Sequence, residues 1–388
     1  MAGSSIFGIL GKLKQSLAGD GGEGRTESYP LHLYGKLPIY KDFISSGLTE
    51  PGAQEFQKWL STGFSRRWSA REEYKAAEIP AHSFLLPLPE TGRVVAGSLW
   101  GSHDEGGLRK FPFTLFVVLP AGRLASDPLV ALGYLESLED RAGYIRRNYQ
   151  SGRMLASFYE TYRGARAELT LQAPSAAEKQ VADEVSEVTL ADFAESVLGP
   201  AAAREWPGFL ERLASLVADA ENGPGAIRLP LGRALPPEVT LRFWLLWLRQ
   251  QGALEEGKLR GLLVERSLGR SRGVLFFRDL APDDILLLNP ERSDYDQVEE
   301  LGPSAAFLPA GSRTADDPET EREAADPKTA PATPPGDAPA LDARPPEPPP
   351  AGDPVPAPDG AAEPEPPGEA PPAPAGWDQP LSALLSTG

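Results

Sequence analysis

Two short stretches of the chain combine residue types that could do chemistry. Ser102, His103 and Asp104 are the three residue types of a hydrolase triad. A triad needs side chains that converge in space, whereas contiguous side chains point in different directions, and no Gly-x-Ser-x-Gly turn surrounds Ser102. We therefore expect a tight turn that is capped by the Asp104 carboxylate and closed by an ion pair with Arg109 across the loop.

The second stretch is Gly35-Lys36, which follows an apolar run as the Gly-Lys pair of a phosphate-binding loop does. That motif also needs an earlier glycine, five positions before, and a Ser or Thr after the lysine. Here those positions hold Pro30, which has no N–H to donate to a phosphate, and Leu37, which cannot bind Mg²⁺. The sequence thus argues against nucleotide hydrolysis at Lys36.

Metal and thiol chemistry lack the side chains that they need. The chain has no cysteine, which excludes disulfides, thiolate metal sites and a cysteine nucleophile. His32, His82 and His103 are scattered and match no spacing typical of metal ligands. We therefore expect no metal and no cofactor. No run approaches the roughly 18 apolar residues of a membrane helix and the N-terminus is a poor signal peptide, so the cytoplasm is the expected location.

The uneven composition of the 388-residue chain predicts its domain organisation. Residues 311–380 hold 21 of the 41 prolines and 15 acidic residues against four basic ones, so about −11 of the formal charge of −17 lies there. Such a segment has too few apolar side chains to offset its ordering entropy. We expect residues 311–388 to form a disordered, acidic, Pro-rich tail with an apolar peptide at its end. The remaining charge of about −6 argues weakly against nucleic acid as a partner.

Between residues 29 and 310 the patterns predict an α/β domain. Apolar and β-branched runs predict strands at 29–34, 83–88, 93–100, 112–119, 261–267, 273–278 and 285–288. Helical spacing predicts helices near 54–68, 127–149, 154–162, 190–198, 207–220 and 238–250, with 172–188 as an acidic connector. This order predicts a mixed sheet flanked by helices, a layered α/β sandwich. Residues 1–28 are expected to form a short amphipathic helix and a flexible linker, which either docks on a partner or packs on the body.

Two blocks of this domain form a recognisable pattern. The first is an aromatic-Gly-Lys-Leu-Pro run, then Asp-Phe, then Trp-Leu, at Tyr34, Gly35, Lys36, Leu37, Pro38, Asp42, Phe43, Trp59 and Leu60. The second is Ser-x-Asp, then Arg, then Phe-Pro entering a strand, at Ser102, Asp104, Arg109, Phe111 and Pro112. Together the blocks resemble the TagF (ImpM) family of type VI secretion-associated proteins. The resemblance extends more loosely from Tyr29 to Leu301, and it departs from the family at Lys41 and Glu105.

The resemblance implies a cytoplasmic regulator that is not an enzyme. Members of this family repress assembly or firing of the contractile secretion apparatus after translation, by binding a forkhead-associated scaffold protein. Two alternatives stay open. The chain could be a scaffold or adaptor of the secretion machinery whose terminal peptides recruit partners, or an enzyme such as a hydrolase.

The motif residues have both structural and functional interpretations. In the structural one, Gly35 adopts a backbone that other residues avoid, Asp42 caps a turn and Phe43 is buried against the sheet. In the functional one, Lys36 and the nearby Lys41 present positive charge at the rim of a partner-binding surface.

The tryptophans raise the same question. Trp59 is expected in the core, and an exposed tryptophan would be a candidate interface anchor. Trp377 and the leucines after it are either a peptide ligand or an unused terminus.

Overall fold

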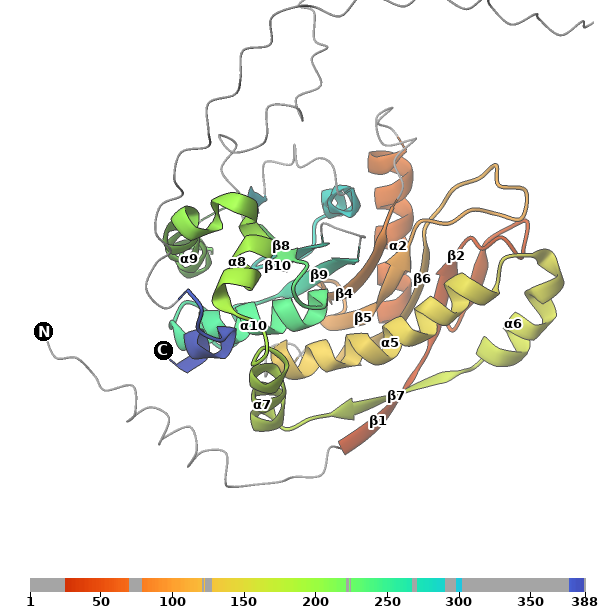
Figure 1. Ribbon diagram of the computed structural model, residues 1–388. Coiled ribbons are helices and arrows are strands. Elements are labelled where there is room, and N and C mark those ends of the chain that lie inside the picture. The colour runs from red at the N-terminus through yellow and green to blue at the C-terminus, as the bar shows by residue number, and fades with distance from the viewer. Residues whose placement is uncertain are drawn as a thin grey trace, which may run out of the picture. The chain divides into compact units, whose positions relative to one another are not determined.

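The structure, a computed structural model, describes most of the chain between residues 25 and 301 and a short segment near the end (Figure 1). The described residues are 25–69, 79–120, 122, 128–220, 223, 225–266, 271–289, 298–301 and 377–386. The helix expected within residues 1–28 and most of the expected tail, residues 311–376, lie outside the described residues, as does the end of the expected α/β domain, residues 302–310.

A mixed sheet forms the centre of the described part. The strands are β1 (Arg25–Pro30), β2 (His32–Gly35), β3 (Ile44–Ser46), β4 (Ala81–Leu88), β5 (Arg93–Trp100), β6 (Phe113–Pro120), β7 (Arg166–Leu171), β8 (Ala226–Gly232), β9 (Gly261–Arg266), β10 (Ser271–Phe276) and β11 (Glu299–Glu300). Nine of them pair in the order β11-β8-β10-β9-β4-β5-β6-β2-β3 among the described residues. The β11–β8 pair is parallel and the other pairs of this sheet are antiparallel. A separate antiparallel ribbon joins β1 to β7.

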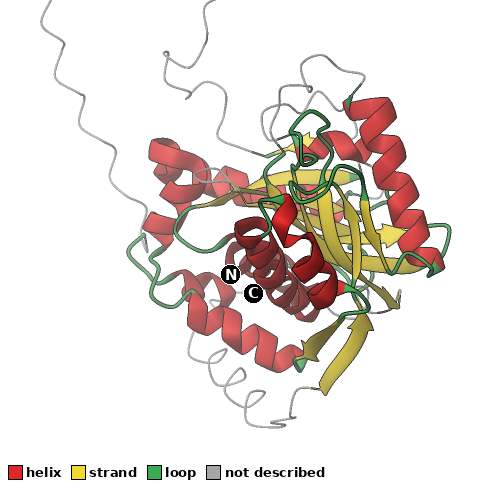
Figure 2. Ribbon diagram, turned by 90° about the vertical axis from the view of Figure 1, so that its right-hand side faces the viewer, coloured by secondary structure: helices red, strands yellow, loops and turns green. Residues whose placement is uncertain are grey.

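Helices cover both faces of the sheet (Figures 1 and 2). They are α2 (Pro51–Gly63), α5 (Pro128–Asn148), α6 (Leu155–Tyr162), α7 (Pro174–Glu184), α8 (Leu190–Leu198), α9 (Ala202–Ala218) and α10 (Pro237–Gln250). Shorter turns are the π-helix η1 (Phe64–Trp68) and the 3₁₀ helices η2 (Gly152–Met154), η3 (Gly199–Ala201), η4 (Pro282–Leu288) and η6 (Leu381–Ser386). One hydrophobic core lies between the sheet and α5, α8 and α10, and a second lies between the sheet and α2, η1 and η4.

Apolar spacing explains how α5, the longest of the described helices, lies on the sheet. In α5 the buried side chains Leu132, Leu135, Leu138, Ala142 and Ile145 recur every three or four residues. This spacing places them on one stripe that packs against the sheet. The helix begins at Pro128, as expected, because the fixed backbone angle of proline suits a first helical position.

The structure confirms the expected fold class and most of the expected elements. The predicted strands at 83–88, 93–100 and 112–119 are the sheet neighbours β4, β5 and β6, and both β5 and β6 are buried almost throughout. The predicted strands at 261–267 and 273–278 form the antiparallel pair β9–β10. Continuous apolar runs predicted these strands because both of their faces are covered.

Four expectations about the elements were wrong. The predicted strand at 29–34 is interrupted at Leu31, so its first part lies in β1 of the ribbon and its second part lies in β2 of the sheet. Residues 285–288 form the end of the 3₁₀ helix η4, because Asp284 accepts a hydrogen bond from the main-chain N–H of Ala281 and so begins a helical turn. The acidic connector at 172–188 contains helix α7. Helix α9 begins at Ala202 and not at Pro207, so this proline lies inside the helix.

Two buried polar groups mark how tightly the sheet is covered. His82, in β4, is fully buried, and its Nδ1 lies 2.9 Å from the main-chain oxygen of Pro80. Burial is the main cause that lowers the pKa of His82 to about 3, and the charge of Arg228 adds to it. Arg242, in α10, is also buried and donates hydrogen bonds to Glu136 in α5 at 2.8 Å and to Glu184 in α7 at 3.1 Å.

Candidate functional site

The Gly-Lys-Leu-Pro block lies at the end of strand β2, against the start of β6. Gly35 has a φ of +132°, and a Cβ on it would lie 2.2 Å from the main-chain oxygen of Pro112 and 2.7 Å from the Cα of Phe113. Only glycine fits such an approach of two backbones. The first motif block is therefore packed directly on the second.

Lys36 and Phe43 do not lie where we expected them. Lys36 is buried, with its Nζ 4.3 Å from the centre of the Phe43 ring and 4.0 Å from Oδ1 of Asp42. Lys36 therefore contributes no charge to an exposed rim. Phe43 is 38% exposed, because it lies on the outside of Tyr34, whose ring it stacks on at 5.5 Å. The Asp42 carboxylate accepts a hydrogen bond from the N–H of Phe43 at 2.8 Å, which makes a local turn.

A chain of aromatic rings connects this block to the second one. The Phe43 ring meets Phe111 edge-on at 4.9 Å, and Phe111 meets Phe64 edge-on at 4.9 Å. Phe64 in turn stacks on Trp68 at 6.3 Å. Offset and edge-to-face rings at these separations attract one another beyond their burial. The aromatic residues of both blocks thus form one packed cluster with the π-helix η1.

The second block is a short hairpin between β5 and β6, residues 101–112, and Asp104 holds it together. The buried Asp104 carboxylate accepts a hydrogen bond from Nε of Arg109 at 2.6 Å and from the main-chain N–H groups of Leu108 at 3.2 Å and Arg109 at 3.3 Å. The hydrogen bond from the Arg109 side chain is the main cause that holds the pKa of Asp104 below its usual value. Arg109 also donates to the main-chain oxygen of Lys41, which ties the hairpin to the first block.

The same geometry shows how Ser102 and His103 are used. His103 Nδ1 lies 2.8 Å from the main-chain oxygen of Asp104, and His103 pairs with Lys110 as an isolated β-bridge. The Ser102 main-chain oxygen accepts a hydrogen bond from the N–H of Phe111 at 3.0 Å. The carboxylate of Asp104 faces Arg109 and not His103, so the three residues lead into the turn at 105–106 and do not form a triad.

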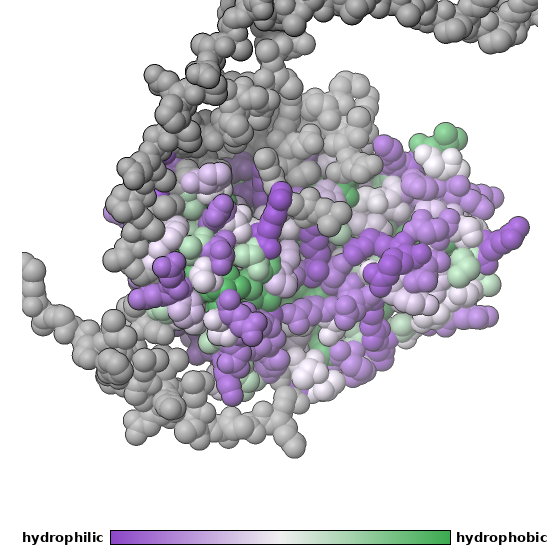
Figure 3. All heavy atoms as spheres, viewed as in Figure 1, coloured by the Kyte–Doolittle hydropathy of each residue, from purple (hydrophilic) through white to green (hydrophobic). Residues whose placement is uncertain are grey.

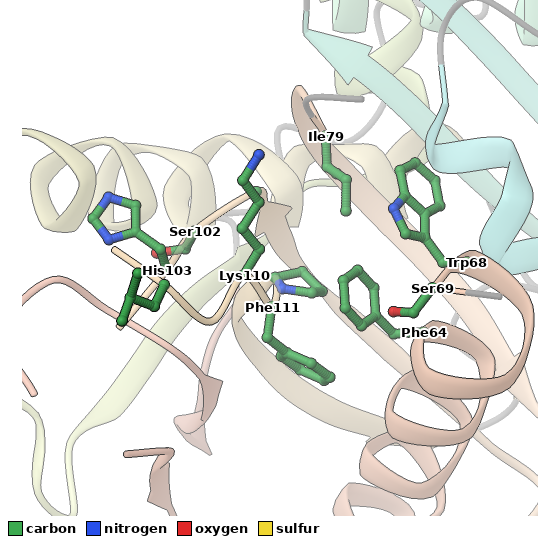
Figure 4. Close-up of a pocket in the computed structure, with 11 residues that line it drawn as sticks. Phe64, Trp68, Ser69, Ile79, Ser102, His103, Lys110 and Phe111 are labelled. Atoms are coloured by element: carbon green, nitrogen blue, oxygen red, sulfur yellow. The ribbon is translucent and has the colours of Figure 1, made fainter. Parts of the chain in front are cut away.

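A cavity of about 570 Å³ opens beside this hairpin (Figure 4). Its lining comes from the end of α2 and η1, from the approach to β4 and from the hairpin, and includes Phe64, Trp68, Ile79, Lys110, Phe111 and Pro112. Figure 4 shows Phe64, Trp68 and Ile79 around its apolar side, with Lys110 and the hairpin opposite. The volume lies in the range typical of small-ligand pockets, and apolar walls with one cation, Lys110, among the described lining residues suit an apolar anchor beside a negative group.

Sequence reasoning had named the supports of this cavity but not most of its lining. Leu108, which lines it too, is 90% exposed, the largest exposed fraction among the large apolar side chains of the described residues. Trp68, Ile79 and Lys110 were also missed as site residues. These residues come from segments that are distant in the sequence, so no local pattern connects them. The sequence signal for this site was Leu108 itself, an apolar residue between glycine and arginine in the loop Gly-Gly-Leu-Arg.

The four remaining candidate residues do not line the cavity. Trp59, in α2, donates a hydrogen bond from Nε1 to the main-chain oxygen of Ala281 at 2.9 Å and stacks on Phe56 at 5.7 Å, so it joins α2 to the start of η4. Leu37 is buried and Pro38 is half-buried. Trp377 is half-buried on the opposite core, beside α8.

In the described part of the chain, no three acidic, histidine or cysteine side chains come together as a metal site would need. Nor does any helix within the described ranges have the length and apolar character to cross a membrane.

Comparison with known proteins identifies the part of the chain that holds the cavity. Residues 32–154 match the TagF N-terminal domain, which is described as type VI secretion system-associated. Residues 32–154 therefore form a TagF N-terminal domain. The match includes both motif blocks and every cavity residue named above. The protein is therefore type VI secretion system-associated.

One solved structure adds a second comparison. The crystal structure of PA0076 from Pseudomonas aeruginosa PAO1 at 2.05 Å resolution matches this chain with 28% sequence identity and a TM-score of 0.23. The match covers 28% of this chain and 52% of that chain, so this chain spans about half the length of that solved protein. No curated protein matches the chain.

Proposed function

We propose that this protein acts as a TagF regulator, a non-enzymatic, cytoplasmic protein that represses assembly of the type VI secretion system by binding a forkhead-associated scaffold protein. The family match supports the association with the secretion system, and the resemblance of both motif blocks to the family supports the regulatory role. The observation that carries the proposal is the cavity beside the hairpin, with the exposed Leu108 at its edge.

The hairpin has the properties of a protein-binding surface. An exposed leucine is held on a backbone that Asp104 and Arg109 fix, so little conformational entropy is lost when a partner covers it. Apolar anchors that fit into pockets dominate the binding energy of protein interfaces, and polar groups surround them. Leu108 and the cavity provide one such anchor and one such pocket.

The charge around the hairpin indicates what the partner presents. Lys41, Arg109 and Lys110 are exposed in this region, against the exposed acidic residues Asp42 and Glu105. The net charge here is positive although the whole chain carries −17. A partner surface with an apolar side chain flanked by acidic groups complements this region, because opposite charge steers association and excludes wrong partners.

The arrangement of Ser102, His103 and Asp104 supports a role without catalysis. A general base has to lie within hydrogen-bond reach of the group that it deprotonates, and the Asp104 carboxylate that would orient His103 binds Arg109 and the hairpin N–H groups. These interactions stabilise the surface and leave no activated nucleophile at Ser102.

The test is capture of the purified forkhead-associated protein of the same secretion system by the full chain. We expect the wild-type chain to bind it and Leu108→Asp to lower the affinity at least tenfold, about 1.4 kcal/mol, because a charge replaces an apolar anchor. Ser69→Trp, which places a large ring in the cavity lining, should weaken binding as well. Ser215→Asp is the matched control, because it adds the same charge at an exposed position of α9 outside the matched domain.

The outcomes separate the partner from the surface. If the wild-type chain does not bind the scaffold protein, the proposed function is wrong. If it binds and neither Leu108→Asp nor Ser69→Trp weakens the complex, the function stands and the assigned surface is wrong. Loss of binding in Trp377→Ala alone would support the alternative of an adaptor that acts through its terminal peptide.

A further inference from the structure

The last described segment of the chain, residues 377–386, binds back onto the body. The main-chain N–H groups of Leu190 and Ala191 donate to the main-chain oxygens of Gln379 at 2.8 Å and Trp377 at 3.1 Å. In return the N–H of Leu381 donates to the main-chain oxygen of Val188 at 2.7 Å. The 75 residues from 302 to 376 separate this segment from the rest of the described chain.

These hydrogen bonds satisfy a helix end that the body leaves open. Leu190 and Ala191 are the first two residues of α8, and the first N–H groups of a helix have no partner inside it. Thr189 caps only the third position, where its side chain accepts a hydrogen bond from the N–H of Asp192 at 3.1 Å. The segment thus supplies two acceptors that α8 itself lacks, and it does so through its main chain.

The side chains of the segment add apolar anchors. Leu381 is fully buried and Leu385 is 6% exposed, and both belong to the core between the sheet and α5, α8 and α10. The short helix η6 that carries them contacts α7 and α10. In Figure 1 this blue segment lies beside α10, and in Figure 3 hydrophobic residues gather in the same part of the face.

We propose that residues 188–191, α7 and α10 form a peptide-binding site, and that residues 377–386 are its detachable ligand. The pattern that it recognises is a turn that begins with Trp, then Pro-Leu, then a helical turn with a second Leu four residues later, as in Trp377, Pro380, Leu381 and Leu385. Main-chain pairing gives affinity that does not depend on side chains, and the leucine positions give specificity, as in other peptide-recognition sites. This site lies outside the matched TagF N-terminal domain and is independent of the hairpin surface.

Detachment follows from how the segment is connected. All of the contacts described above come from residues 377–386, and a connection of 75 residues is long enough for this segment to leave the site while it stays attached to the chain. A tethered ligand weakens the binding of a free peptide by a factor that grows with the effective concentration of the tethered segment divided by the Kd of that segment for the site. The site is therefore closed to weak peptides and open to a tighter or more concentrated peptide of the same pattern.

The experiment uses the full chain and a fluorescent synthetic peptide of residues 374–388. Leu381→Asp places a charge where a fully buried leucine lies, so the segment leaves its site. We expect this variant to bind the peptide one to one, and the wild-type chain to bind it at least tenfold more weakly because its own segment occupies the site. Gln379→Asp is the matched control, since it adds the same charge to an exposed side chain of the segment and keeps the main-chain acceptor.

Amide hydrogen exchange on the same samples locates the binding. The N–H groups of Leu190 and Ala191 should be protected in the wild-type chain, exchange faster in Leu381→Asp and regain protection when the peptide is added. Should Leu381→Asp fail to fold, Leu385→Asp releases the same segment from its other buried leucine. The proposal is overturned if a folded variant with the segment released binds no peptide, or if the wild-type chain binds it as tightly as the variant does.

Discussion

Replacing Gly35 with alanine tests whether the Gly-Lys-Leu-Pro block is a structural support. At a φ of +132° a side chain is strained by about 1–3 kcal/mol, since this backbone region is used almost only by glycine. The added Cβ would also lie 2.2 Å from the main-chain oxygen of Pro112, and backbone atoms cannot move away as the end of a flexible side chain can. Such overpacking costs typically about 1–3 kcal/mol more. We therefore expect Gly35→Ala to lower the free energy of unfolding by about 2–6 kcal/mol, out of a total that is usually about 5–15.

The chain contains a matched control for this substitution. Gly92, in the turn between β4 and β5, has a φ of +63°, and a Cβ on it would meet nothing within 4 Å. Gly92→Ala should therefore cost only the strain of a left-handed backbone, about 1–2 kcal/mol. The two variants separate the cost of the backbone angle from the cost of the close approach.

Urea unfolding of the full chain measures both costs. Linear extrapolation gives the free energy of unfolding of the wild type and of each variant in the same buffer. A Gly35→Ala loss that lies within about 0.5 kcal/mol of the Gly92→Ala loss would refute the tight packing of β2 on Pro112 and Phe113 that we infer.

Two further predictions concern pH. Because the folded pKa of Asp104 lies below its ordinary value of 3.8, the Asp104 carboxylate should stabilise the folded state above that value and lose this contribution as the pH falls through the lowered pKa. The difference in Tm between the wild type and Asp104→Asn should therefore be the same at pH 7 and pH 5 and shrink at pH 3. A difference that persists at pH 3 would contradict the ion pair with Arg109. The pKa of His82 is lowered from 6.5 to about 3, so below pH 6.5 the unfolded chain takes up a proton that the folded chain does not. Urea unfolding should show a loss of about 2 kcal/mol between pH 7 and pH 5 that is missing in His82→Asn, and equal losses in both proteins would show that His82 is not buried in its neutral form.

The strands could be predicted from the sequence because local pattern determines them. Both faces of β5 and β6 are covered, so these strands are almost continuously apolar, and the pattern ends at polar turns. The ion pair of Asp104 and Arg109 could be predicted for a similar reason, since the two residues are five positions apart in one loop. Such features depend on neighbours in the sequence.

The features that were missed depend on residues far apart in the chain. Lys36 is buried because the segment after β2 brings Phe43 and Asp42 over it, and a lysine considered by its type alone is expected in solvent. The run Ile285–Leu288 has the composition of a strand, and its helical form depends on Asp284, which also accepts two hydrogen bonds from Arg278 at 2.7 and 2.8 Å. Residues 377–386 could be identified as an apolar peptide, but the site on α8 that they occupy has no signal in their own sequence.

The packing of the two motif blocks limits what mutations in them can show about partner binding. Gly35 supports Pro112 and Tyr34 supports Phe111, so a change in the first block alters the wall of the cavity without touching a partner. Loss of binding after such a change is the expected result of a damaged support and does not identify a contact. Leu108 extends into solvent from the same hairpin and has little packing to lose, so its substitution separates contact from support. The exposed residues of the hairpin, and not the motif that holds it, therefore decide whether this surface binds the scaffold protein.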